Sequence, residues 1–254
     1  MSVIIKTEDQ ISLMRESGHL LAELHRQLHE ALKPGISTLE IDQLGEKLIN
    51  QMGAIPNCKN YEGFPGSICI SINEEVVHGI PSADRYIQEG DIVTLDTGLI
   101  YKGWHSDAAR TWGIGRISQE KQQLIDVTRQ SFFEGIKKAV AGNRIFDISR
   151  AVDKYVTEYG YGIVHELTGH GIGQSIHEEP YIPNYRQIRR GMKLCAGMTI
   201  CVEPMITMGK RHVAWLDDGW TVVTVDGSPA AHYENTIVIT EGEPEILTII
   251  DNDD

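Results

Sequence analysis

The chain has 254 residues, of which 41% are hydrophobic and 23% are charged, a composition typical of a globular domain. Its formal net charge of -13 argues against specific nucleic-acid binding, because phosphate recognition requires a basic surface. No apolar run approaches the roughly 20 residues of a membrane span, the N-terminus does not resemble a signal peptide, and the four cysteines form no paired motif, so we expect a cytoplasmic protein with free thiols.

Two helices are predicted at the start of the chain. They extend over about residues 7–32 and 37–52. Each begins with a capping box, in which a Ser or Thr is followed three residues later by Glu or Gln. His25 and His29 are four residues apart on the first helix, where nothing nearby could complete a metal site. We therefore expect both histidines on the solvated face.

Strand patterns begin after residue 66. Residues 67–72 alternate in polarity as a half-buried strand does, and residues 91–100 and 104–114 predict two strands joined by a tight turn. The remaining predicted elements are helices over 118–140 and 147–159, the second capped by Asp147, and strands near 198–208, 213–215, 219–225 and 231–239. Because helices and strands come in separate runs without a linker, we expect an α+β fold in a single catalytic domain over residues 1–254.

Several side chains suited to metal binding lie in apolar or glycine-rich surroundings. They are Asp96, Asp107, His170, Glu203 and Glu234. A buried carboxylate is costly unless a cation neutralises it, so carboxylates gathered by the fold would require a multivalent metal. Taken singly, each also has an ordinary explanation, such as a turn cap, a strand end or a histidine satisfied in a turn.

The spacing of Asp96 and Asp107 indicates that the two carboxylates act together. They lie on the two strands of the predicted hairpin, where a tight turn would let both face the same side of the sheet. The segment from His165 to His170 is not an HExxH zinc motif, because its histidines are five residues apart rather than four.

Two further histidines, His78 and His177, lie in loop sequences and could each place an imidazole near a reacting carbonyl or amine. A cysteine nucleophile, with Cys58 or Cys69 near His78, is disfavoured because nothing in the sequence indicates a lowered thiol pKa.

Taken in order, these motifs resemble the type I methionine aminopeptidases. The matching segments are DIVTLDTG at 91–98, HSDAART at 105–111, TGHGIG at 168–173, VEP at 202–204 and YENT at 233–236. The resemblance runs from about residue 3 to residue 250. It implies the pita-bread α+β fold, in which two halves related by a pseudo-twofold axis share a central antiparallel sheet covered by helices.

The resemblance also implies roles for the candidate ligands. Two divalent cations (cobalt, manganese, iron or zinc) would be held by the five side chains named above. In the family, the residue matching Asp96 serves one metal, and those matching Asp107 and Glu234 bridge both. The residues matching His170 and Glu203 complete the second metal site.

Catalytic and substrate-binding roles follow from the same resemblance. Glu203 would also relay a proton, His177 would stabilise the carbonyl oxygen, and His78 would contact the scissile nitrogen. The methionine side chain would be bound by Cys58, Tyr61, Phe64, Cys69, Ile176 and Trp220. Phe64 replaces a tyrosine and Ile176 a phenylalanine that are common in the family, and both changes keep the pocket wall apolar.

The implied activity is removal of the initiator methionine from nascent proteins whose second residue is small. The implied partners are the N-terminal methionine of peptides and nascent chains, and the ribosome near its exit tunnel, with the enzyme a monomer. The alternative on the same fold is a proline-specific (X-Pro) peptidase, a class that usually carries a further N-terminal domain. A non-catalytic peptide- or RNA-binding relative is disfavoured by the complete ligand set and the acidic charge.

Overall fold

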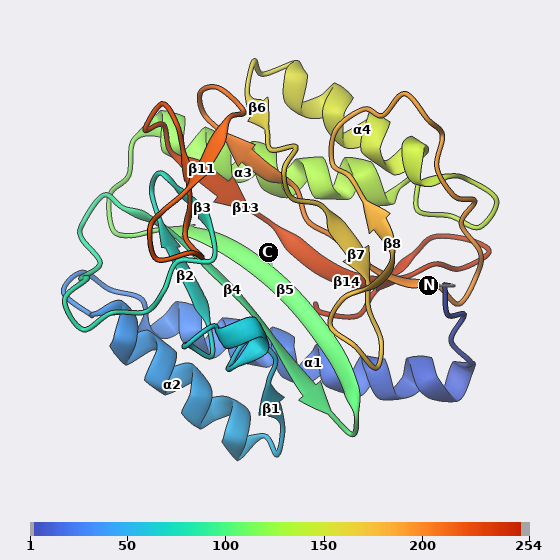
Figure 1. Ribbon diagram of the computed structural model, residues 1–254, viewed down its shortest axis with the longest axis horizontal. Helices are drawn as coiled ribbons and strands as arrows, with labels where there is room; N and C mark the ends of the chain where they lie inside the picture. The colour runs from blue at the N-terminus through green and yellow to red at the C-terminus, as the bar shows by residue number, and fades with distance from the viewer. Residues whose placement is uncertain (1–2, 250–254) are drawn as a thin grey trace.

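A nine-stranded antiparallel sheet runs through the molecule, with one pair of helices along each side (Figure 1). The structure is a computed structural model that describes residues 3–249. The helices are α1 (Glu8–Ala31), α2 (Thr38–Gln51), α3 (Gln119–Ile136) and α4 (Ile145–Thr157), with a short 3-10 helix η1 (Tyr61–Gly63). No helix among the described residues is long and apolar enough to cross a bilayer.

The large sheet contains strands from both halves of the chain. Its order is β1 (Ile55–Pro56), β4 (Ile92–Tyr101), β5 (Trp104–Gly113), β14 (Glu234–Val238), β9 (Thr199–Val202), β7 (Gly169–Gly171) and β8 (Glu178–Ile182), with β2 (Cys69–Ile72) paired to β4 and β15 (Glu245–Ile246) paired to β14. There are two further sheets of three strands each. The order of the first is β13 (Ala230–His232), β10 (Met205–Thr207) and β6 (Gly162–Ile163). The order of the second is β11 (Val213–Trp215), β12 (Val222–Thr224) and β3 (Glu75–Val77). The arrangement confirms the expected α+β class with a central antiparallel sheet.

Both predicted capping boxes are present. The Thr7 hydroxyl accepts a hydrogen bond from the backbone N–H of Gln10, and the Ser37 hydroxyl accepts one from that of Glu40. In each box the side chain of the third helical residue accepts a hydrogen bond from the cap residue's own N–H. These reciprocal bonds satisfy donors that a helix start otherwise leaves without partners.

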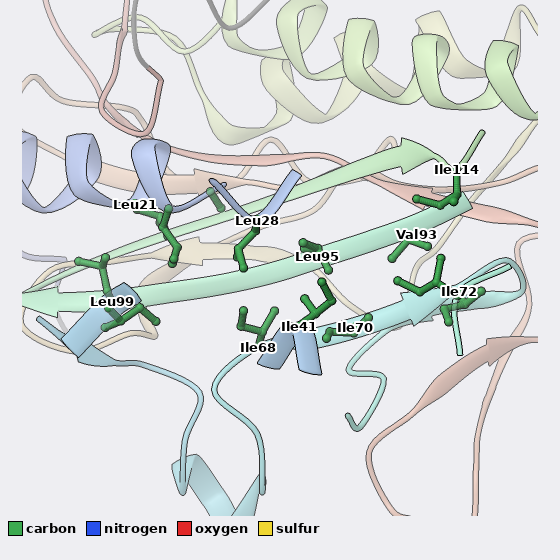
Figure 2. Packing of buried hydrophobic residues seen from close by; sticks show 14 of the residues in the cluster. Leu21, Leu28, Ile41, Ile68, Ile70, Ile72, Val93, Leu95, Leu99 and Ile114 are labelled. Carbon is green, nitrogen blue, oxygen red and sulfur yellow. The ribbon is translucent and has the colours of Figure 1, made fainter. Parts of the chain in front are cut away.

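The core of the first half lies between α1, α2 and the β2–β4–β5 strands. Figure 2 shows Leu21 and Leu28 of α1 and Ile41 of α2 against Leu95 of β4, and all four are fully buried. Burying such side chains contributes about 1.5–3 kcal/mol each. This packing holds the β4–β5 hairpin in place from one face.

The expectation for His25 was wrong. Its side chain is buried against β5, and its Nε2 lies 3.0 Å from the carbonyl oxygen of Ala108, to which it donates a hydrogen bond. His29 is exposed, although its ring stacks on Trp112 with centroids 4.7 Å apart. The helix therefore turns His25 toward the sheet, where the carbonyl of Ala108 supplies the partner that a buried imidazole requires.

Three other features differ from the sequence expectation. Strand β2 is buried on both faces rather than one, because the segment around Gly79 covers the face opposite the helices and donates its N–H to Ser71. Helix α3 ends at Ile136, and α4 begins after Arg144, whose N–H donates to Asp147, so Asp147 is the third helical residue and not the cap.

The predicted C-terminal strands are also shorter than expected. The stretch 198–208 divides into β9 and β10 at Glu203–Pro204, and the stretch 231–239 divides into β13 and β14 at Tyr233. Proline has no N–H for a sheet ladder, which explains the first interruption. The break leaves Glu203 directly after the last residue of β9.

Candidate metal centre and substrate pocket

The register of three neighbouring strands brings three of the candidate carboxylates together. Asp96 of β4 and Glu234 of β14 both pair with Ala109 of β5, so they flank one small side chain in a single row across the sheet. Asp107 pairs with Gly98, which makes it a diagonal neighbour of Asp96 on the same face, as the hairpin predicted. A larger residue at position 109 would stand between the carboxylates.

The other two candidates join this row from β9 and β7. Asn235 pairs with Val202, which places Glu234 beside Glu203 beyond the end of β9. His170 lies at the centre of β7, which pairs with β9, and its Nε2 is 3.7 Å from Oε1 of Glu203 and 3.9 Å from Oε1 of Glu234. Four carboxylates and one imidazole therefore converge from five segments of chain.

The electrostatics of this cluster are unfavourable without cations. Burial raises the pKa of Asp107 to about 7, and burial together with the neighbouring carboxylates raises the pKa values of Asp96, Glu203 and Glu234 well above their usual range. Oδ1 of Asp107 and Oε1 of Glu234 are buried and have no hydrogen-bond partner among the described residues. Divalent cations at this position would supply both the missing partners and the missing charge.

The histidine of the cluster has a tautomer that suits metal binding. Nδ1 of His170 lies 2.9 Å from the carbonyl oxygen of Gly171, and because a carbonyl only accepts, Nδ1 carries the proton. The Nε2 lone pair is thereby left free and directed at the carboxylates. Burial lowers the pKa of His170 to about 3, so the ring is neutral over the physiological range.

The donor set fits divalent transition metals. Carboxylate oxygens with one imidazole nitrogen are ligands suited to cobalt, manganese, iron or zinc. The thiol of Cys201 lies within 4.8 Å of ligand atoms of His170 and Glu234. Burial and the nearby carboxylates raise the pKa of Cys201, which keeps it a protonated thiol and a poor ligand.

One residue of the centre was missed in the sequence. His232, the last residue of β13, is 1% exposed, and its Nδ1 lies 3.9 Å from Oδ2 of Asp96. Its Nε2 lies 3.9 Å from Oε2 of Glu203 and 3.9 Å from Oε2 of Glu234. Neither ring nitrogen has a hydrogen-bond partner within the described part of the chain. Its position two residues before Glu234 was the available signal, since alternate residues of a strand share a face.

A pocket of about 490 Å³ opens onto the carboxylate cluster. The residues that the sequence assigned to the site all line it: Cys58, Tyr61, Phe64, Cys69, His78, Asp96, Asp107, His170, Ile176, His177, Glu203, Trp220 and Glu234. The lining residues that the sequence did not single out are Glu62, Val77, Glu166, Leu167, Thr168, Tyr181 and Met205. The structure thus places the expected ligands and the expected apolar residues around one space.

Aromatic and sulfur-containing side chains form one wall of the pocket. Phe64 is buried and meets Trp220 edge-on, with ring centroids 5.2 Å apart. Cys69 begins β2 and pairs with Asp96, so the wall adjoins the carboxylates directly. A wall of this kind suits a flexible apolar side chain that carries a polarisable atom.

Both loop histidines, His78 and His177, line the pocket. His177 precedes β8, and its Nδ1 lies 2.8 Å from the hydroxyl of Tyr61. His78 follows β3 in the left-handed region, with φ of 61°, and meets Trp220 edge-on at 6.1 Å. A non-glycine residue in this region is strained, and such strain concentrates at functional sites. Partial burial lowers the pKa of His177, and burial lowers that of His78 to about 4, so both imidazoles are neutral at neutral pH.

Comparison with known families and sequences gives one consistent picture. The profile of metallopeptidase family M24 matches residues 12–241. The methionine aminopeptidase of Clostridium acetobutylicum is 51% identical over 97% of this chain and 99% of its own length. Methionine aminopeptidase 1 of Bacillus subtilis is 46% identical over 97% of this chain and 99% of its own length.

Solved structures agree with the sequence comparisons. The methionine aminopeptidase of Rickettsia prowazekii superposes with a TM-score of 0.95 at 38% identity, covering 98% of this chain and 100% of that one. The prolidase of Pyrococcus furiosus superposes with a TM-score of 0.78 at 23% identity, covering 98% of this chain but 66% of the prolidase. At that identity the prolidase likeness concerns the fold alone.

Proposed function

The chain belongs to metallopeptidase family M24, and we propose that it removes the N-terminal methionine from peptides and nascent proteins whose second residue is small. The observation that carries this proposal is the convergence of four carboxylates and His170 beside an apolar pocket. A site of this kind places a peptide bond next to the candidate metal ligands while the pocket binds the first side chain. The fold is the pita-bread fold of the family.

Five side chains would hold two divalent cations: Asp96, Asp107, His170, Glu203 and Glu234. When bound, such cations would polarise a peptide carbonyl and lower the pKa of a water molecule, so that it could attack the carbonyl as hydroxide near neutral pH. Two features would favour such cations: the Nε2 lone pair of His170 is free, and Oδ1 of Asp107 and Oε1 of Glu234 have no hydrogen-bond partner among residues 3–249.

The methionine side chain would be bound by the apolar wall. Phe64 and Trp220 offer aromatic surface, and Cys58, Cys69 and Ile176 complete the lining. The thioether of methionine makes favourable contacts with aromatic rings, worth about 0.3–1.5 kcal/mol each. The apolar lining, which includes Phe64 and Ile176, would favour an apolar side chain over a charged one.

His177 would stabilise the carbonyl oxygen as it gains negative charge. With Tyr61 donating its hydroxyl proton to Nδ1, the remaining proton of the neutral imidazole lies on Nε2, from which it can be donated to the substrate. Desolvation raises the pKa of Tyr61, which keeps the phenol protonated for this purpose. A preorganised donor of this type contributes on the order of 10²–10³ in rate.

His78 and Glu203 would serve the leaving amine. Glu203 lies among the carboxylates, where it can accept a proton from the attacking water and pass it to the amine nitrogen. His78, held in a strained conformation at the pocket, would hydrogen-bond the scissile amide N–H through an unprotonated ring nitrogen. Its low pKa ensures that this nitrogen is available at neutral pH.

The proposal is tested with short peptides. After treatment with EDTA, the protein should lose the ability to hydrolyse Met-Gly-Met and regain it when cobalt, manganese, iron or zinc is added back. Gly-Pro and other X-Pro peptides serve as the comparison. Cleavage confined to X-Pro peptides, or hydrolysis of Met-Gly-Met that chelation leaves unchanged, would overturn the proposal.

The cellular setting is proposed with the activity. The substrate is the N-terminus of a chain emerging from the ribosome near its exit tunnel, which places the enzyme in the cytoplasm. The whole chain would act as one catalytic domain and as a monomer. Cosedimentation with ribosomes and light scattering of the purified protein test these statements; a dimer, or absence from the ribosome fraction, would contradict them.

A further inference from the structure

A buried ion pair outside the candidate metal centre joins the N-terminal arm to the loop that carries His177. Nζ of Lys6 lies 2.6 Å from Oε2 of Glu178, and the two side chains are 2% and 10% exposed. Neither residue belongs to the pocket lining. Glu178 is the first residue of β8 and immediately follows His177.

The Glu178 carboxylate uses its second oxygen to close the loop between β7 and β8. Oε1 accepts hydrogen bonds from the backbone N–H groups of Gln174, at 2.9 Å, and Ser175, at 3.3 Å. The loop segment that carries Ile176 and His177 is thus tied back onto the carboxylate that Lys6 neutralises.

The N-terminal arm is itself fixed to the protein. The backbone N–H of Lys6 donates to the carbonyl oxygen of Gly197 at 2.8 Å, in the turn that precedes β9. On the other side of the ion pair, the carbonyl oxygen of Gly173 accepts a hydrogen bond from the N–H of His105 in β5 at 2.8 Å. The loop is therefore anchored to β5 at Gly173 and, through Lys6, to the turn before β9.

The ion pair occupies the space that a side chain at position 173 would need. A Cβ built there would lie 2.6 Å from Oε1 of Glu178 and 2.7 Å from Cε of Lys6. Such distances are closer than van der Waals contact allows, so the pair packs directly against the loop backbone. A buried ion pair adds little net stability, but it permits few alternative geometries because each charge needs its partner.

We propose that the Lys6–Glu178 ion pair sets the position and orientation of the His177 imidazole in the pocket. The inference rests on the proposed function, in which His177 donates a hydrogen bond to the substrate carbonyl. The imidazole of His177 is itself in contact with the hydroxyl of Tyr61, at 2.8 Å, and with the ring of His170, with centroids 4.4 Å apart. Both constrain the ring, whereas Lys6 and Glu178 constrain the backbone that carries it.

The experiment measures kcat and KM for Met-Gly-Met together with metal affinity. Lys6→Met removes the cation beside the Glu178 carboxylate and should lower kcat about tenfold to hundredfold, the loss expected from displacing a catalytic group by about 1 Å. The manganese Kd should stay within about twofold, since no metal ligand touches the pair, and any rise in KM should be smaller than the fall in kcat, because Ile176 is the one member of the apolar wall carried by this loop. Lys6→Arg keeps the charge and should recover most of the kcat.

Two further variants keep the test decisive. Lys102→Met removes a lysine from an exposed pair with Glu16 and should behave as the wild type. If Lys6→Met does not fold, Glu178→Gln replaces it, because the amide oxygen can still accept from the loop N–H groups while the charge is lost. In a double-mutant cycle, Lys6→Met combined with Glu178→Gln should cost no more than the worse single change.

The imidazole resonances of His177 in the zinc-loaded protein give a readout independent of turnover. They should shift in Lys6→Met, while those of His25, which packs against β5 beside Trp112, should not. A folded Lys6→Met variant with wild-type kcat and unshifted His177 resonances would refute the inference, as would a loss confined to metal affinity. Failure of the wild-type protein to cleave Met-Gly-Met would instead refute the proposed function.

Discussion

The imidazoles of His170 and His232 face opposite carboxylate oxygens of the same two glutamates. Nε2 of His170 lies 3.7 Å and 3.9 Å from the Oε1 atoms of Glu203 and Glu234, whereas Nε2 of His232 lies 3.9 Å from the Oε2 atom of each. These distances are longer than a hydrogen bond, so the two histidines lie beside the carboxylates without donating hydrogen bonds to them.

From this relationship we predict that His232 contributes to metal binding. His232→Ala should raise the manganese Kd about 10- to 100-fold, the usual effect of removing a group that orients metal ligands. Calorimetric titration of the metal-free protein measures it, with His29→Ala as the control because His29 lies on the exposed side of α1. Unchanged affinity in His232→Ala would show that its ring nitrogens serve another group.

Metal affinity should also depend steeply on pH. Burial raises the pKa of Asp107 to about 7, so near and below this pH a cation must displace a proton from a carboxyl that would be ionised in water. The apparent affinity is therefore expected to fall about tenfold per pH unit for each proton displaced as the pH drops from 8 to 6. Titrations in buffers of different ionisation enthalpy would count the released protons, and none released at pH 6.5 would contradict the assignment.

Glu203→Gln should abolish turnover without unfolding the protein. The amide keeps the shape of the side chain but cannot carry a proton to the amine, and loss of an acid–base group costs on the order of 10²–10⁴ in rate. Removing one charge also relieves the repulsion that raises the pKa values of its neighbours, so the metal-free variant should melt no lower than the wild type.

A second buried glutamate provides the control for this variant. Glu75 binds Arg85 at 2.7 Å and lies outside the carboxylate cluster, so Glu75→Gln should retain kcat while losing some stability. Near-normal turnover in Glu203→Gln would reject its role as the proton carrier.

His25 should make stability sensitive to acid. Burial lowers its pKa from 6.5 to about 3, so the folded protein holds it neutral while the unfolded chain protonates it below pH 6.5. Its contribution to stability is complete above pH 6.5 and is lost as the pH falls toward 3, at about 1.4 kcal/mol per pH unit.

The matched variant is His25→Gln, whose amide can still donate to the carbonyl of Ala108. Urea unfolding of both proteins at pH 7, 6, 5 and 4.5 should show a shallower decline for the variant. Parallel declines would mean that His25 does not titrate on unfolding in this range.

Features that depend on neighbouring residues were predictable from the sequence. The capping boxes at Thr7 and Ser37 need residues only three positions apart, and the β4–β5 hairpin needs two apolar runs and a short turn. Resemblance to the family added the identity of the candidate ligands, and the structure gathers all of them around one pocket.

Other features became visible only in the folded chain. Burial of His25 follows from α1 packing against β5, the role of Ala109 as the small residue between Asp96 and Glu234 follows from strand register, and Lys6 meets a partner 172 residues away. A local pattern states which residues favour a helix or a strand, but it does not state which distant segment will lie against them. Those pairings are set by sheet register and by the burial of side chains, and both are properties of the whole chain.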